Sequence, residues 1–116
     1  MLSNKLKKKD QYASVFKSGE YLKLNSVIIQ HCKRISPDII NKPRFGIIAS
    51  RKIGNSVKRN FAKRRLRALV NIVAKHGKKN SDYIFVAKKN LLNENFSMLS
   101  LEFKKGLNKI KEDNNE

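Results

Sequence analysis

The amino-acid sequence predicts a single α+β domain, in which a four-stranded central sheet is packed against helices in the order α-β-β-β-α-β-α. Two nearly continuous apolar runs, residues 44–50 and 82–87, are typical of buried strands. Residues 56–75 between them have apolar side chains at helical spacing. With 116 residues and 40% hydrophobic content, the chain can bury one core without covalent cross-links. We expect one domain over 1–116, with flexible ends at 1–9 and 111–116.

The N-terminal third predicts a short helix followed by a hairpin. Residues 10–18 have the spacing of a helix. Residues 20–24 favour an extended segment, and the Asn-Ser pair at 25–26 indicates a turn. Residues 27–33 follow as a strand, because they open with three β-branched side chains.

Two aromatic residues share one face of the first predicted helix. Tyr12 and Phe16 are one turn apart, and by residue type alone they favour core packing. The alternative is that one ring edge stays open for a nucleobase to stack on. On the strand that follows, alternation places Ile28 and Gln30 on one face. His31, on the other face, is interpreted as surface or edge packing because no nucleophile motif accompanies it.

The C-terminal two thirds predict a strand, a long helix, a strand and a last helix. The strand at 44–50 is followed by a Gly-Asn-Ser turn, whose Asn55 or Ser56 is suited to cap the helix at 56–75. After the strand at 82–87, residues 96–111 form a helix with one apolar face. That face consists of Phe96, Leu99, Phe103, Leu107 and Ile110.

A helical projection of residues 56–75 gives two apolar stripes and one polar arc. The first stripe consists of Val57, Phe61, Ala68 and Ile72, and the second of Ala62, Leu66, Leu69, Val70 and Val73. Together they predict a wide surface laid against a sheet. Arg65 falls between the stripes, so we expect its stem to lie on apolar surface while its guanidinium reaches water.

The segment 50–70 carries an extreme charge bias. No carboxylate occurs between Asp38 and Asp82, although a solvated helix usually mixes charges of both signs. The chain has a net charge of +18 and a pI near 10.3, so we expect a polyanionic partner and salt-dependent binding. The basic residues of this segment are Arg51, Lys52, Lys58, Arg59, Lys63, Arg64, Arg65 and Arg67.

Several classes of function are disfavoured by the sequence. A single cysteine, Cys32, allows no internal disulfide and no cysteine-based metal cluster. No apolar run is long enough to span a membrane and no signal segment is present, so a cytoplasmic location is expected. The nine acidic residues are scattered without a convincing metal-binding spacing, and no catalytic triad or phosphate-cradling glycine loop is present. We predict no catalytic residue and no metal ligand, which leaves a nucleic-acid-binding module.

At this point the residues resemble a known family. The pattern Arg59-Asn60-x-x-Lys63-Arg64-x-x-Arg67, preceded by Lys52-x-Gly54-Asn55-x-Val57, is similar to the signature of the bacterial ribonuclease P protein component. The resemblance extends to the N-terminal segment and to residues 82–88. The family motif usually has arginine at the position of Phe61, so we expect that arginine's contact to be lost or taken over by Arg65 or Lys58.

The resemblance implies a function together with RNA. Such proteins join a catalytic RNA, which holds the Mg²⁺ ions, to remove the 5′ leader of precursor tRNA. Ribonuclease P RNA and precursor tRNA are then the partners, with no membrane and no obligate protein partner. It also implies a left-handed βαβ crossover. Carried onto this chain, the RNA-binding residues are Arg51, Lys52, Lys58, Arg59, Asn60, Lys63, Arg64 and Arg67, and the leader cleft consists of Tyr12, Phe16, Ile28 and Gln30.

Three other classes of protein compete with this interpretation. A DNA-binding helix-turn-helix protein would need a short helix just before residue 56, where a strand is predicted instead. A ribosomal protein would have a similar composition and would bind ribosomal RNA. A membrane-surface helix would separate its basic and apolar arcs more cleanly than Lys58 and Arg65 allow.

Overall fold

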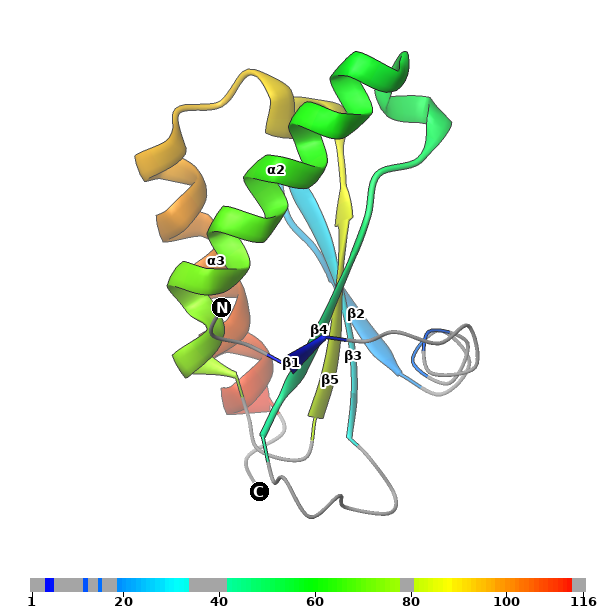
Figure 1. The fold of residues 1–116 in the computed structure, drawn as a ribbon. Helices are drawn as coiled ribbons and strands as arrows, with labels where there is room; N and C mark the ends of the chain where they lie inside the picture. Colours follow the sequence, from blue (N-terminus) through cyan, green and yellow to red (C-terminus); the bar gives the residue numbers. More distant parts are fainter. Residues whose placement is uncertain are drawn as a thin grey trace.

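A mixed β-sheet carries two long helices on one of its faces (Figure 1). This computed structural model describes residues 4–5, 12, 15, 19–33, 42–77 and 81–113. Phe16 lies outside these residues, as do residues 34–41 and 78–80. Of the first predicted helix, positions 12 and 15 are described, and both are helical.

The four predicted strands are present and form the body of the sheet. They are β2 (Glu20–Lys23), β3 (Val27–Lys33), β4 (Arg44–Ile48) and β5 (Ser81–Ala87). The order across the sheet is β1-β4-β5-β3-β2, where β1 is a two-residue strand at the edge. β5 is parallel to β4 and antiparallel to β3, so the last strand of the chain occupies the middle of the sheet. Its side chains are buried on both faces, as the apolar run predicted.

Strand β1 (Asn4–Lys5) lies within the segment 1–9, for which the sequence predicted no regular structure. It pairs in parallel with the start of β4, with Asn4 beside Arg44 and Lys5 beside Phe45. Without β1, the main-chain N–H and C=O groups at the start of β4 would be unpaired on this edge of the sheet. The pairing is made by the main chain, so a polar segment can form it without any apolar periodicity.

Helices α2 (Ser56–Val73) and α3 (Phe96–Asp113) match the two long helices that the sequence predicted. Short 3-10 helices join the elements: η1 (Arg51–Ile53) precedes α2, η2 (Ala74–His76) continues it and η3 (Lys89–Leu92) precedes α3. Helix α3 continues two residues beyond its predicted end at Lys111. Both helices cover the same face of the sheet (Figure 1).

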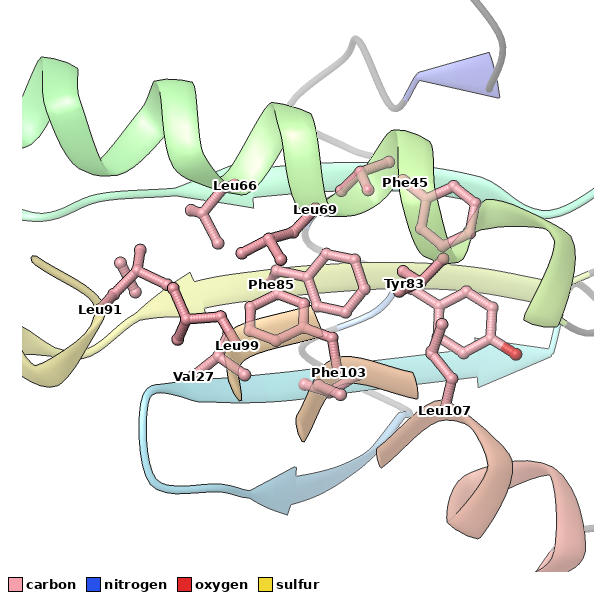
Figure 2. Packing of buried hydrophobic residues seen from close by; sticks show 14 of the residues in the cluster. Val27, Phe45, Leu66, Leu69, Tyr83, Phe85, Leu91, Leu99, Phe103 and Leu107 are labelled. Carbon is pink, nitrogen blue, oxygen red and sulfur yellow. The ribbon is translucent and has the colours of Figure 1, made fainter. Parts of the chain in front are cut away.

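The β4–α2–β5 connection is left-handed. Figure 2 views the sheet from the side that the helices cover, and when the strands are turned to point upward β5 lies to the left of β4. A right-handed crossover, the usual arrangement, would place β5 on the right. The expectation taken from the family resemblance is therefore confirmed against the general rule.

The core lies between the helices and the sheet, and aromatic rings run through it (Figure 2). The ring of Phe45 stacks on Tyr83 with centroids 5.3 Å apart, and Phe85 contacts Phe103 of α3 at the same centroid distance. The predicted apolar face of α3 is buried, with Phe96 packed at its margin. Burying these rings supplies most of the driving force that holds α3 to the sheet.

Helix α2 buries the second of its two predicted stripes. All five side chains of that stripe are buried against the sheet and α3. The first stripe is largely outside the core, since Val57 is 76% exposed and Ile72 is 38% exposed. The prediction of a wide docking surface is therefore wrong, because α2 meets its neighbours through one arc of about 100°, the usual width of a core-facing stripe.

Candidate nucleic-acid interface

The basic segment begins in a tight turn that aims the chain from β4 into α2. The hydroxyl of Ser50 accepts a hydrogen bond from the Lys52 amide at 3.3 Å, which caps η1. Gly54 has φ +143°, a conformation that L side chains rarely adopt. The side chain of Asn55 then accepts from the Lys58 amide at 3.0 Å, which makes Asn55 the N-cap of α2. Arg51 and the first turn of α2 are thereby held close together.

The predicted RNA-binding residues lie on η1 and along α2, where they give the segment a cationic surface. Arg59 and Lys63 are partly buried, so their stems are fixed by packing. The remaining six residues are exposed: Arg51, Lys52, Lys58, Asn60, Arg64 and Arg67. Because residues 42–77 contain no carboxylate, no acidic side chain of that segment offsets this charge. The surface is therefore suited to a polyanion.

Arg65 departs from the sequence prediction. Its guanidinium is bonded to the protein, because Nη1 donates to the carbonyl oxygen of Leu91 at 2.9 Å and to that of Glu94 at 2.5 Å. Both bonds are partly buried, and they join the middle of α2 to η3 and to the segment between η3 and α3. Arg65 thus holds the two helices in place instead of presenting charge to a ligand.

Phe61, the residue that breaks the family motif, completes this structural contact. Its ring lies 5.0 Å from the Arg65 guanidinium and 5.9 Å from that of Arg64, both measured to the ring centroid. Because Nη1 of Arg65 is bonded to two main-chain carbonyl oxygens, the structure gives Arg65 a structural role that the sequence analysis did not foresee. Lys58, which is exposed, remains a candidate for the contact of the missing arginine.

The sheet face opposite the long helices carries the described part of the predicted cleft. Tyr12 lies against Gly46 of β4, where a Cβ atom would stand 2.6 Å from the tyrosine hydroxyl and 2.7 Å from its ring. Val15 and Ile84 are buried beneath this region, and Tyr12 packs against them. Ile28 and Gln30 are half-buried on this same face. Tyr12 is itself only partly buried, so it combines packing with an open edge.

The packing contact between Tyr12 and Gly46 can be tested by stability measurements. Gly46→Ala should lower the free energy of unfolding by about 1–3 kcal/mol, because the added methyl group overlaps the tyrosine ring. In a Tyr12→Ala background the same substitution should cost less than about 0.5 kcal/mol, because the ring is gone. Chemical denaturation of the wild type, the two single variants and the double variant measures this coupling. Equal losses of stability from Gly46→Ala in the two backgrounds would contradict the contact.

His31 lies on the opposite face from Gln30 and is buried. It is 4% exposed, and its ring packs on that of Tyr83 with centroids 4.9 Å apart. The predicted packing role agrees with this contact, whereas a place at the surface or the sheet edge is wrong, since β3 lies between β2 and β5.

The cationic surface and the cleft face approach each other at one end of the sheet. Figure 1 shows the chain leaving β4, swinging out as η1 on the side of the sheet away from α3, and turning back into α2. The main chain of η1 therefore lies on the side of the sheet away from α3.

The described residues offer no group of three or more His, Cys, Asp or Glu side chains that could hold a metal ion. Asp82, which is 4% exposed, is paired with Arg44 by two hydrogen bonds of 2.8 Å each. That pair joins β4 to β5 at directly opposed positions. Over the same described ranges, no helix has the length and apolar character needed to cross a membrane.

Comparison with known proteins identifies the family. The model of the ribonuclease P family matches residues 2–111, nearly the whole chain. This chain belongs to the ribonuclease P protein family. It is 34% identical to the ribonuclease P protein component of Bacillus pumilus over 86 residues, which covers 74% of this chain and 70% of that protein. The corresponding protein of Carboxydothermus hydrogenoformans is 27% identical over 94 residues, 81% of this chain and 79% of the relative.

Solved structures of ribonuclease P proteins share the fold. The Staphylococcus aureus protein superimposes with a TM-score of 0.77 at 23% identity, over 94% of this chain and 96% of that one. The Thermotoga maritima protein gives a TM-score of 0.76 at 21% identity, over 91% and 96% of the two chains. The agreement confirms the predicted α+β class.

Membership of this family decides between the classes of protein that the sequence left open. A ribonuclease P protein component takes part in an endoribonuclease complex of tRNA processing and has an RNA partner. The ribosomal and membrane-surface interpretations are therefore set aside. The helix-turn-helix interpretation also fails on geometry, because β4 and the three-residue η1 are what immediately precede α2.

The sequence predictions missed the role of Arg65 and did not single out Tyr21. The hydrogen bonds of Arg65 to main-chain carbonyls leave no sequence signal, since any residue type can supply a carbonyl. Tyr21 of β2 lies beside Gln30, and this could have been found from the hairpin. A two-residue turn at 25–26 fixes the register, and the register puts Tyr21 and Gln30 on one face.

Proposed function

We propose that this chain, as the protein subunit of ribonuclease P, binds the catalytic RNA through η1 and α2 and the 5′ leader of precursor tRNA across the opposite sheet face. Because the protein binds the catalytic RNA and the leader together, it promotes removal of the leader, which yields the mature 5′ end of the tRNA. The observation that carries the proposal is an acid-free cationic surface that adjoins a sheet face bearing Tyr12. The partners are two RNAs, with no membrane or protein partner required, in the cytoplasm.

Phosphate contacts explain the choice of residues on α2. A Lys or Arg side chain that neutralises a phosphate releases a condensed counterion, and that release drives association. Arg59, Lys63, Arg64 and Arg67 lie on one side of α2, so they can follow a single backbone. Asn60, also exposed, adds a hydrogen-bonding group that can contact a sugar or a base edge.

In this proposal catalysis belongs to the RNA, and the protein contributes position and charge. Mg²⁺ ions are held mainly by RNA phosphates in this proposal, because phosphate oxygens are hard ligands of the kind that Mg²⁺ prefers. A cationic surface beside the cleavage site lowers the repulsion between the catalytic RNA and the leader. Less Mg²⁺ is then needed to bring the two together.

The proposal is tested by cleavage of a precursor tRNA at low Mg²⁺ concentration. Three reactions are compared: a bacterial ribonuclease P RNA alone, the same RNA with this protein, and the protein alone. We expect cleavage to be stimulated only when both components are present. Cleavage by the protein alone would reveal an active site in the chain, and the absence of stimulation would overturn the proposal.

Leader recognition gives a separate prediction. Tyr12→Ala should weaken the affinity of the holoenzyme for a leader-bearing precursor by about fivefold or more, because base stacking on an aromatic ring is worth about 1–3 kcal/mol. The affinity for mature tRNA should stay within about twofold, because that ligand has no leader. Phe16, which lies outside the described residues, is predicted to behave in the same way. Equal losses for both ligands would remove Tyr12 from the cleft.

A further inference from the structure

Tyr21 is an exposed aromatic side chain with no role in the surfaces described so far. It lies on β2, one of the two edge strands of the described sheet, and is 61% exposed. The chain's two other tyrosines are engaged, since Tyr83 is fully buried and Tyr12 lies against Gly46. An aromatic ring that stays open to solvent exposes a π face to which a ligand can bind.

The hairpin places this ring next to the proposed leader cleft. The Leu24 amide donates to the Val27 carbonyl at 2.8 Å, which closes a two-residue turn. The resulting register sets Tyr21 directly opposite Gln30. Directly opposed residues of antiparallel strands project to the same face, with Cβ atoms about 5 Å apart. Tyr21 therefore extends the cleft face by one strand, toward the free edge of the sheet.

A cation accompanies the ring. Lys23 lies opposite Ile28, two residues along β2 from Tyr21, and is exposed. Its ammonium nitrogen is 5.9 Å from the centroid of the Tyr21 ring. An exposed aromatic ring with a lysine beside it is the combination that binds single-stranded nucleic acid, because the ring stacks on a base and the cation contacts a phosphate.

We propose that Tyr21 is a stacking platform for one unpaired base of the RNA leader, and that Lys23 binds the neighbouring phosphate. The inference rests on the proposed function, because the leader is taken to cross this face. Gln30 can hydrogen-bond a base but has no π face, so the ring beside it supplies the stacking surface. A single strand is the fitting ligand, because the bases of a duplex are already stacked on each other.

The experiment uses the holoenzyme reconstituted with a bacterial ribonuclease P RNA. Its ligands are a precursor tRNA with a leader of about ten nucleotides and the mature tRNA. Tyr21→Ala should weaken binding of the precursor roughly fivefold to tenfold, whereas Tyr21→Phe, which keeps the ring, should stay within about twofold. Leu101→Ala is the matched control, because Leu101 is 51% exposed and lies on α3, across the sheet from the cleft.

A crosslinking measurement identifies the contact directly. Single 5-iodouridines are placed along the leader, and irradiation should join one position to Tyr21 in the wild-type holoenzyme. Tyr21→Leu should abolish that crosslink while the melting temperature of the protein remains unchanged. If Tyr21→Ala still stimulates cleavage and the holoenzyme still binds the leader-bearing precursor as tightly as the wild type does, the role of Tyr21 is overturned. The proposed function would stand in that case. If the wild-type protein does not stimulate cleavage of the precursor, the proposed function is overturned as well.

Discussion

Replacing Lys63, Arg64 and Arg67 together with alanine is expected to weaken binding to ribonuclease P RNA by about a hundredfold near 0.1 M salt. The three side chains lie on the polar arc of α2, where two of them are exposed and the third is half-buried. Each phosphate contact contributes about 0.7–0.9 to the slope of log affinity against log salt, so the slope should flatten by about 2–3. The loss should shrink as salt rises and nearly vanish near 1 M.

Filter binding over a salt series measures this effect, and a matched variant separates position from total charge. Lys75, Lys105 and Lys109 are exposed lysines on η2 and α3, so replacing them with alanine removes the same three charges elsewhere. We expect that control to change the slope by less than about 1. Equal effects of the two triple variants would show that α2 binds RNA only through net charge.

Arg65→Ala is expected to have the opposite profile, with a large loss of stability and an unchanged salt slope. The substitution removes two hydrogen bonds from a charged donor to the carbonyls of Leu91 and Glu94, and the contact with Phe61. Bonds to charged groups contribute about 1.5–3 kcal/mol, so the free energy of unfolding should fall by about 2–3 kcal/mol. In thermal unfolding this corresponds to a midpoint about 10 °C lower.

Its neighbour provides the control for this prediction. Arg64 is exposed, and the contact of its guanidinium with Phe61 is the longer of the two. Arg64→Ala should therefore cost less than about 0.5 kcal/mol of stability, while it reduces the salt slope by about 0.7–0.9. If Arg65→Ala instead left the melting temperature unchanged and flattened the salt slope, Arg65 would be an RNA contact.

The elements that the sequence predicted well are those with a strong apolar period. Strand β5 and the buried face of α3 are examples, because each buries nearly all of its apolar side chains. The exposed stripe of α2 was predicted wrongly, because a helical projection shows which residues share a face but not which face has a neighbour. The position of α3 relative to α2 decides that, and it depends on the whole fold.

In the candidate site, too, the features set by local sequence were predicted and the long-range contacts were not. The motif positions on α2 follow from local sequence, and the structure leaves six of the eight predicted RNA-binding residues exposed. The role of Arg65 depends on carbonyl groups 26 and 29 residues away, so no local pattern contains it. The pairing of β1 is likewise made by the main chain alone. Such main-chain contacts explain most of what the sequence analysis missed.

The central place of β5 has a consequence for how the protein is made. β5 is the last strand to be synthesised, yet it lies between β3 and β4. Until residue 87 has left the ribosome, β3 lacks its partner on one side and β4 lacks its longer partner. A nascent chain in that state presents open strand edges, which favour aggregation. Folding of the sheet therefore waits until about three quarters of the chain have been synthesised, and a transcript truncated before β5 should yield insoluble protein.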